Sequence, residues 1–314
     1  MGLYFVRPTM MTPPGATFKR MRVEIEQAIS LLRQGDDEGL EKALTLLQNT
    51  VFSFSMRVCG QREDAEDTMQ EVLVKSVQHL AKFDNPKALL VWLYKVAKNH
   101  CLMTRRRSKF APASDLSLDE LMPDRKELEQ LSSDGSVNPE TFAIRSEEAW
   151  RLRAAVQKLP PQYRIVLVLR DMEGLTDDEV AEITGLRAGT VRVRLHRARL
   201  FVRKELMKAW KPRESLQAVI AQHAEAPKAG RCKAMFAELS DYLDEQLDDS
   251  LCKELEQHLS DCGPCQAFLA TLEATVVRCR KSPSDCPSGQ KAGKFRKELA
   301  QKYRRAAAAV KARS

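Results

Sequence analysis

Three cysteines and one histidine in the last third of the chain have the residue types and spacing of a metal site. His258 and Cys262 are four residues apart, so both side chains project from one face of a helix. The Gly-Pro pair that follows Cys262 ends that helix and starts another, which leaves Cys265 near a helix N-terminus, where the pKa of a thiol is lowered. If an intervening helix brings Cys232 alongside, the four side chains close a tetrahedral zinc site. Because all four ligands come from the protein, no position is open for a substrate, and we expect no hydrolysis.

Other interpretations of these cysteines stay open. Cys252 is a rival for the fourth ligand, and a reduced CxxC pair beside an unrelated histidine needs no metal. Redox release of zinc also stays open, because oxidised thiols do not bind the metal. We assign no role to the remaining cysteines, Cys59, Cys101, Cys279 and Cys286.

A second chemically informative stretch, residues 174–203, reads as two helices joined by a tight turn. Thr176 and Glu179 match a capping box, which predicts a helix from Asp177, and Gly185 suits the left-handed residue that ends it. In the following helix an apolar stripe is formed by Val191, Leu195, Ala198 and Val202. The arginines between them are expected to stay outside: Arg192, Arg194, Arg197, Arg199 and Arg203. This pattern predicts a helix-turn-helix whose second helix enters the major groove of DNA.

Charged side chains also recur at helical spacing in the first third of the chain. Asp64, Asp67 and Glu71 form a row opposite an apolar stripe, although such a row by itself is usually solvated surface. The next helix, residues 88–107, is apolar at first and ends in three arginines. Cations stabilise a helix C-terminus, and three in succession also indicate contact with phosphate.

Length and charge distribution agree with several small helical units and a polyanionic partner. The chain has 314 residues and a net charge of +8, more than one average domain. Residues 151–213 hold fifteen Lys or Arg against seven Asp or Glu, whereas residues 235–261 hold one Lys against nine acids. Residues 290–314 hold nine basic residues and one Glu. The apolar runs are too short for a signal peptide or a membrane span, so we expect a cytoplasmic protein without membrane contact. In a reducing compartment, eight cysteines favour metal or free thiols over disulfides.

Two long motifs now carry a resemblance. The first consists of DAEDTMQEVLVK followed by VWLYKVAKNHCLMTRRR, and the second is LPPQYRIVLVLRDMEGLTDDEVAEITGLRAGTVRVRLHRARLFVRKEL. In these two motifs the chain resembles bacterial sigma factors of the extracytoplasmic-function (ECF) group. The resemblance covers about residues 40–110 and 145–210, in the family's order. It implies an all-α protein with two helical modules, sigma region 2 and the region 4 helix-turn-helix, followed here by a small helical zinc-binding domain.

The resemblance implies roles for individual residues. The residues that match the family's contact with the clamp helices of core RNA polymerase are Asp64, Asp67, Gln70 and Glu71. Residues 83–90, with Asn85, match the loop that captures a flipped base of the promoter −10 element. The adjoining helix, which holds the melting strand, matches at Trp92, Lys95, Asn99, Arg105, Arg106 and Arg107; a core position is the alternative for Trp92. The −35 element of promoter DNA would be read by Arg187, Thr190, Arg192, Arg194 and Arg197. Arg187 departs from the family, which usually has a small polar cap there, and losing that cap costs about 1 kcal/mol.

The expected organisation follows from these matches. It comprises a disordered start (1–18), region 2 (19–110), an acidic flexible linker (111–140) with a short helix near 124–131, region 4 (141–213), a second linker (214–230), the zinc domain (231–280) and a basic tail (281–314). The tail has three candidate partners in this interpretation: DNA, the acidic zinc domain, or none.

The C-terminal third resembles the zinc-binding anti-sigma domain, through Cys232, His258, Cys262 and Cys265 and the framework of Tyr242, Leu243, Asp244 and Leu247. Such a domain is normally a separate inhibitor. Its fusion here leads to the hypothesis that its acidic helices fold back on the basic modules in cis, at the high effective concentration of a linked domain. The competing hypothesis is an appendage that only stabilises the protein or binds a partner.

Three classes of function remain. A sigma factor binds core polymerase, whereas a stand-alone helix-turn-helix regulator binds duplex DNA by itself, and the acidic row counts against the latter. An enzyme needs a catalytic constellation or an open metal site, and the sequence offers neither, so we expect no catalysis.

Overall fold

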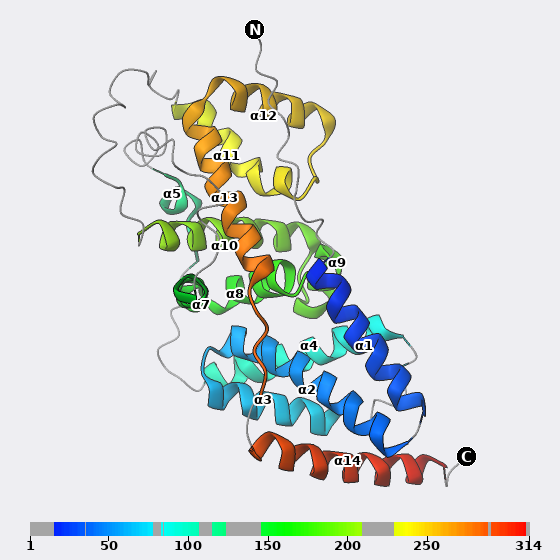
Figure 1. Cartoon of the computed structure of the whole chain (residues 1–314). Helices are drawn as coiled ribbons and strands as arrows, with labels where there is room; N and C mark the ends of the chain where they lie inside the picture. Colours follow the sequence, from blue (N-terminus) through cyan, green and yellow to red (C-terminus); the bar gives the residue numbers. More distant parts are fainter. Residues whose placement is uncertain are drawn as a thin grey trace.

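The computed structural model describes residues 16–34, 36–77, 83, 85–106, 115–123, 146–208, 229–287 and 290–311. Within these ranges every regular element is a helix, which agrees with the expected all-α class (Figure 1). The expected disordered start, residues 1–15 of it, lies outside the described residues, and the first helix already begins at Ala16.

Four helices form the N-terminal bundle, namely α1 (Ala16–Gln34), α2 (Asp37–Cys59), α3 (Arg62–Ser76) and α4 (Pro86–Arg106). Asp36 caps α2 by accepting from the amide of Gly39, and Gly60 ends the helix in the left-handed region at φ 81°. Most of α2 after its exposed first turn is buried, because the other three helices pack around it. Its Phe54 ring lies 4.7 Å from that of Tyr94 on α4.

The helix-turn-helix module follows as α7 (Ser146–Lys158), α8 (Pro161–Leu167), the π-helical turn η2 (Val168–Met172), α9 (Asp177–Thr184) and α10 (Ala188–Lys208). The predicted capping box is present, since Thr176 accepts from the Glu179 amide and the Glu179 carboxylate accepts from the Thr176 amide. Gly185 is left-handed at φ 75°, as expected. α9 and α10 therefore begin and end where local sequence predicts.

Three further helices, α11 (Ala229–Leu243), α12 (Asp249–Asp261) and α13 (Gly263–Lys281), form the cysteine module around Phe236 and Phe268, whose rings are 4.6 Å apart. A short helix of the acidic linker, α5 (Leu118–Leu121), joins this core through Leu121. The helix expected near residues 124–131 lies outside the described residues.

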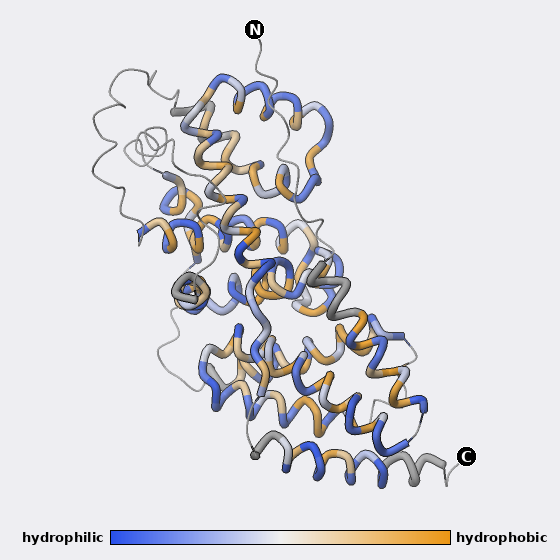
Figure 2. Tube along the Cα trace, in the orientation of Figure 1, coloured by the Kyte–Doolittle hydropathy of each residue, from blue (hydrophilic) through white to orange (hydrophobic). Residues whose placement is uncertain are grey.

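The modules pack together. The buried apolar residues of the N-terminal bundle and of the helix-turn-helix module form one continuous core, and the cysteine module lies on the other side of α10 (Figures 1 and 2). From α13 the chain runs as an extended segment, residues 282–287, along the helix-turn-helix module and back to the N-terminal bundle. There α14 (Gln290–Lys311) packs on α2 and α3. The N-terminal bundle was not among the partners considered for the basic tail.

Candidate metal centre and nucleic-acid interface

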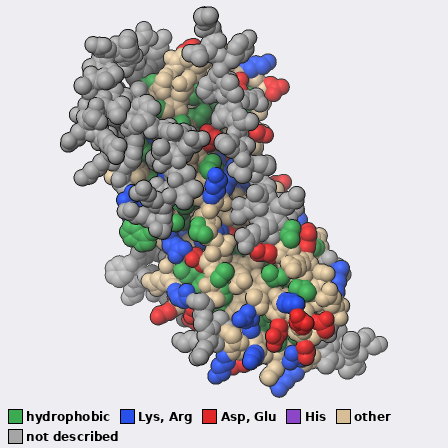
Figure 3. All heavy atoms as spheres, viewed as in Figure 1, with side chains coloured by type: hydrophobic (Ala, Val, Ile, Leu, Met, Phe, Trp, Pro, Cys, Tyr) green, Lys and Arg blue, Asp and Glu red, His purple; other side chains and the backbone are tan. Residues whose placement is uncertain are grey.

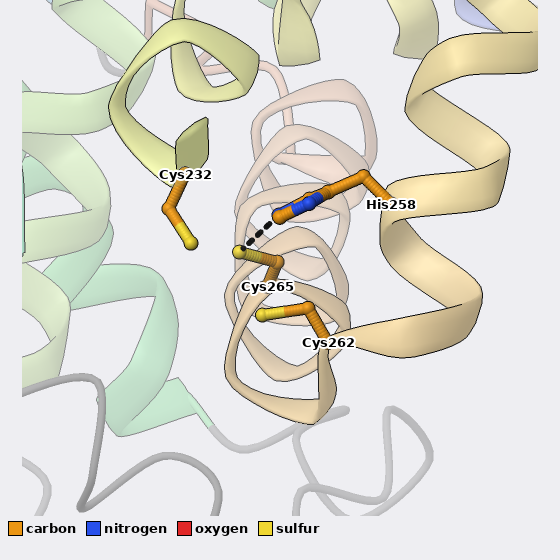
Figure 4. Close-up of side chains that lie close together, drawn as sticks. All are labelled: Cys232, His258, Cys262 and Cys265. Atoms are coloured by element: carbon orange, nitrogen blue, oxygen red, sulfur yellow. Dashed lines mark hydrogen bonds between the residues drawn. The ribbon is translucent and has the colours of Figure 1, made fainter. Parts of the chain in front are cut away.

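The structure brings together the four predicted metal ligands. The ligand atoms of Cys232, His258, Cys262 and Cys265 all lie within 4.8 Å of one another, and Cys252 is outside this group. Cys232 comes from α11 and His258 from α12, while Cys262 and Cys265 flank the start of α13 (Figure 4). Nε2 of His258 lies 3.1 Å from Sγ of Cys265. Three thiols and one imidazole converging from three helices fit a tetrahedral zinc ion, whose bonds are about 2.0–2.3 Å long.

The electrostatics of this cluster also suit a cation. Burial raises the pKa of Cys232 and, more strongly, that of Cys265. The lowering expected from the helix N-terminus at Cys265 is therefore outweighed by desolvation. Buried thiols of this kind become thiolates when a metal ion compensates their charge.

The second helix of the helix-turn-helix, α10, is exposed only in part. Arg187 and Thr190 are exposed at its start, and Arg192, Arg194 and Arg197 are half-buried. Two arginines expected outside are buried instead, Arg199 at 0% and Arg203 at 5% exposure. Together with His196 they form one stripe of α10, and the cysteine module covers that stripe.

Arg199 is the centre of a buried ionic network. Its guanidinium donates to both carboxylate oxygens of Asp171 in η2, at 2.6 and 2.8 Å, and to both of Asp244 after α11, at 2.8 and 3.1 Å. Arg280 of α13 also donates to Asp244, at 3.0 Å. Burial favours the neutral acid, but the arginines around Asp244 hold its pKa below the usual range. The network therefore joins the helix-turn-helix module to the cysteine module through charges that have little access to water.

Two further contacts hold the same surfaces together. Nδ1 of His196 and the Ser240 hydroxyl lie 2.8 Å apart, and burial beside Arg199 lowers the pKa of His196 to about 4. Arg203 donates to the Thr271 hydroxyl at 2.7 Å, and its guanidinium lies 3.8 Å from the centre of the Phe268 ring. The cysteine module thus contacts three successive turns of α10.

The residues matched to the −10 contact lie on or next to α4. Asn85 is exposed and its side chain accepts from the amide of Lys87, so it caps α4, and the expected loop at residues 83–90 already becomes helix at Pro86. Trp92 is half-buried against Phe83, with ring centres 5.9 Å apart. This exposure is intermediate between a surface position that contacts DNA and a core position, the two alternatives for Trp92. Lys95 and Asn99 are exposed. Arg105 and Arg106 end α4, but their side chains lie outside the described part, as does Arg107.

Glu173 joins α4 and α2 to the helix-turn-helix module. Its carboxylate accepts from Nη1 of Arg57 at 2.6 Å and from the Tyr94 hydroxyl at 2.9 Å, and all three residues are buried. Nζ of Lys98 donates to the carbonyl of Ile183 at 2.8 Å, which places α4 directly against α9. The helices matched to promoter contacts, α4 and α10, therefore belong to two modules that pack against each other.

The acidic row of α3 is accessible. Asp67 and Gln70 are exposed, and Asp64 and Glu71 are half-buried. A hydrogen bond from Lys75 lowers the pKa of Glu71, so this carboxylate stays ionised. On the face shown in Figure 3, acidic and basic side chains gather over the part of the molecule formed by α1–α4 and α14.

Sequence analysis missed two buried carboxylates, Asp171, which pairs with Arg199 within the helix-turn-helix module, and Glu173, which joins that module to the N-terminal bundle. Asp171 and Glu173 lie in and after η2, where the π-turn directs one toward Arg199 and the other toward Arg57. The available signal was a pair of acids at the end of a strongly apolar run, directly before Gly174. A buried acid needs a buried partner, and its partner is a long way off in the sequence.

Comparison with known proteins divides the chain into the same three parts, the N-terminal bundle, the helix-turn-helix module and the cysteine module. Family models match residues 44–110 ("Sigma-70 region 2"), 149–202 ("Sigma-70, region 4") and 232–266 ("Putative zinc-finger"). The chain is similar to the ECF RNA polymerase sigma factor SigW of Bacillus subtilis, 29% identical over 189 residues that cover 59% of this chain and 98% of that protein. It is also similar to the RNA polymerase sigma-H factor of Pseudomonas aeruginosa, 28% identical over 58% of this chain and 93% of that protein. The ECF RNA polymerase sigma-E factor of Escherichia coli is 29% identical over 54% of this chain and 88% of its own length. The chain therefore belongs to the ECF RNA polymerase sigma factors, with regions 2 and 4 followed by a zinc-finger segment.

Proposed function

We propose that this protein binds core RNA polymerase and directs promoter recognition, strand opening and transcription initiation, and that its cysteine module inhibits it in cis. It acts by binding, without catalysis of its own. Support for the first part comes from regions 2 and 4 in the family's order and from relatives that are named as sigma factors.

Each module has a separate task in this proposal. The exposed acidic row of α3, Asp64, Asp67, Gln70 and Glu71, docks on the clamp helices of polymerase by charge pairing. The −10 strand is held by Asn85, Trp92, Lys95 and Asn99, with Arg105, Arg106 and Arg107 neutralising phosphates. The −35 duplex is read by Arg187, Thr190, Arg192, Arg194 and Arg197 from the start of α10.

One observation carries the inhibitory part: α10 is covered by the cysteine module along His196, Arg199 and Arg203. A recognition helix must lie in the major groove, so a protein module packed along one of its stripes is in steric conflict with DNA. In the same conformation α4 is packed against α9. The promoter contacts of both modules are accordingly restricted at once.

The chain after α13 makes a second set of contacts with the two sigma modules. Arg57 donates to the carbonyls of Ser282 and Pro283, and Arg153 pairs with Asp285 at 2.8 Å. Beyond this segment α14 buries Leu299 and Ala300, while Arg296 donates to Thr45 and Arg304 pairs with Asp37. The inhibitory part of the chain therefore contacts the N-terminal bundle as well as the helix-turn-helix module.

Zinc has a structural part in this proposal. When bound by Cys232, His258, Cys262 and Cys265, the ion ties α11, α12 and α13 to one another and thereby shapes the surface that covers α10.

The test compares the full chain with a truncation after Lys208, using purified core polymerase and promoter-dependent transcription. The truncation removes the cysteine module and α14 but keeps α1 to α10. We expect it to bind polymerase and to transcribe more strongly than the full chain. Equal activity of the two proteins would leave the sigma function but exclude cis inhibition, and would favour a stabilising appendage. If neither protein bound polymerase, the sigma function itself would be wrong.

A further inference from the structure

The end of α2 is the point at which the N-terminal bundle meets the helix-turn-helix module. The carbonyl of Arg57 accepts from Nε2 of Gln157 at 2.7 Å, and the carbonyl of Val58 accepts from Nη1 of Arg164 at 2.8 Å. At Gly60 an added Cβ would lie 2.2 Å from Oε1 of Gln157, so the two modules approach closely there. The last carbonyls of a helix have no partner within the helix, and here side chains of the helix-turn-helix module donate to them.

Cys59 lies within this contact and is bonded to Cys101 of α4, with their Cα atoms 5.7 Å apart. Both cysteines are buried, at 2% and 1% exposure. The sequence had favoured metal or free thiols over disulfides and had assigned these two cysteines no role; the structure differs because α2 and α4 pack with the two positions face to face. In the compartment where RNA polymerase works thiols are kept reduced, and disulfides there are characteristically transient and redox-sensing.

The residues around this pair connect it to the packing of the N-terminal bundle against the helix-turn-helix module, which we call the closed packing. Cys101 and Tyr94 are seven residues apart on one face of α4, and Tyr94 donates to Glu173 of the helix-turn-helix module. Cys59 is two residues from Arg57, which pairs with the same Glu173. A bond between Cys59 and Cys101 thus fixes the two helices that together hold Glu173.

Thr68 completes the site from α3. Its hydroxyl lies 3.8 Å from Sγ of Cys59, 3.7 Å from Sγ of Cys101 and 2.9 Å from Nδ1 of His100. A polar hydroxyl that contacts both sulfurs and also an imidazole distinguishes this place from an apolar packing of inert thiols.

We propose that Cys59 and Cys101 are a reversible dithiol/disulfide modification site, and that its oxidation by a hydroperoxide stabilises the closed packing of regions 2 and 4. This inference deepens the proposed function and rests on it for its consequence in transcription, although the modification itself does not. Local fluctuation at the helix end admits the small oxidant to the buried pair.

The chemistry balances in two steps. One thiolate attacks the peroxide O–O bond, which breaks to release an alcohol and leaves a sulfenic acid. The second thiol then attacks the sulfenic sulfur, the S–S bond forms, and water leaves. The pair loses two electrons and two protons in total, and a dithiol reductant reverses the change.

The first experiment tests for the Cys59–Cys101 disulfide in the full-length, zinc-loaded protein. After treatment with tert-butyl hydroperoxide, the protein is alkylated under denaturing conditions and digested without reduction, and the peptides are analysed by mass spectrometry. We expect a Cys59–Cys101 cross-linked peptide that dithiothreitol abolishes. Absence of that peptide after oxidation of the folded protein would overturn the proposal.

The second experiment asks whether the bond stabilises the packing. Amide hydrogen exchange is compared between oxidised and reduced protein in α4 and α9. We expect about tenfold slower exchange in the oxidised form, equivalent to about 1.4 kcal/mol. The double variant Cys59→Ala/Cys101→Ala should show no oxidation dependence, whereas the control Cys252→Ala, outside both the metal cluster and this pair, should behave as wild type. Equal exchange in oxidised and reduced wild type would overturn the stabilising role.

Transcription separates this inference from the proposed function. While zinc is retained, oxidation should lower promoter-dependent transcription by the wild type but leave the double variant unaffected. Oxidative loss of zinc acts in the opposite direction, since it frees α10, and zinc release is followed in parallel with a chromogenic chelator. If no variant transcribes, the sigma function fails, while the mass and exchange measurements still decide the fate of the thiol pair.

Discussion

At the scale of single residues, a few buried charges determine how the modules meet. Arg199 is fully buried between Asp171 and Asp244, and Arg57 is buried against Glu173. Removing one partner from such a pair leaves an uncompensated charge in a place that water cannot reach. These interactions therefore control the specificity of packing, and substitution of Asp244 should weaken the contact between the modules while Asp171 still pairs with Arg199 within its own module.

Asp244→Asn tests the contact between the cysteine module and α10. The amide keeps the shape of the side chain but removes the charge opposite Arg199 and Arg280, so docking should weaken by about 3 kcal/mol. We expect promoter-dependent transcription to rise about tenfold or more toward the level of the truncated protein. Asp249→Asn, an exposed acid of α12, is the matched control and should change nothing. Unchanged transcription with Asp244→Asn, in a protein that retains zinc, would contradict the role given to this contact.

His196 makes the same contact sensitive to pH. Its pKa is about 4 in the docked state against 6.5 when free, because burial and the neighbouring Arg199 disfavour the imidazolium. The undocked state binds more protons between these values, so docking is strongest above pH 6.5 and weakens as the pH falls toward 4. The full effect is roughly 3 kcal/mol.

Measurement of this dependence uses hydrogen exchange in α11 and α10 across that pH range. His196→Gln, which cannot be protonated, should flatten the profile relative to the wild type. Zinc retention must be followed as well, because protonation of the metal ligands has the same direction. Parallel profiles of the two proteins would show that another group is responsible.

At the scale of helices, local signals determine where elements begin and end, and apolar stripes determine which face is buried. The capping box of α9 and the left-handed Gly185 were both predicted from sequence, and both are confirmed. The cysteine module then covers Arg199 and Arg203, two of the five arginines of α10 that the pattern assigned to solvent. α14 shows the complementary case, since its narrow apolar stripe meets α2 and α3, while Lys294, Lys297, Lys302 and Arg305 are exposed.

Leu299→Asp should release α14. Leu299 is 1% exposed at the contact with the N-terminal bundle, and a buried carboxylate there costs about 3 kcal/mol or more. We expect faster hydrogen exchange in the first half of α2, where Thr45 and Asp37 hold Arg296 and Arg304. Lys297→Asp, on the exposed side of the same helix, is the matched control. Equal exchange in the two variants would exclude stable docking of α14.

At the scale of the whole molecule, the four predicted metal ligands belong to the module that covers α10. The four predicted ligands come from α11, α12 and the start of α13, so a bound ion would link three helices that already share an apolar core around Phe236 and Phe268. In the part of the chain that the structure describes, no helix is long and apolar enough to cross a membrane.

Removal of zinc should therefore activate the protein. Chelation, or the variant Cys262→Ser, should unfold the cysteine module, lower the helical signal in circular dichroism and expose α10. Promoter-dependent transcription should rise in step with zinc release. Cys286→Ser, an exposed cysteine outside the cluster, should retain zinc and activity. A chelated protein that loses helicity and remains repressed would show that α14 and residues 282–287 suffice for inhibition.

Local sequence by itself determined the helical class, the capped start of α9, the apolar stripes and the four converging metal ligands, because each depends on residues a few positions apart or on the spacing within a helix pair. Only the tertiary structure decided that Arg199 and Arg203 are buried, that Glu173 binds Arg57 and Tyr94, that α14 returns to the N-terminal bundle, and that Cys59 meets Cys101. The physical reason is that periodicity identifies the polar face of a helix but not what covers it. A charged face is solvated unless a distant segment supplies the opposite charge, and that segment is chosen by the packing of the whole chain.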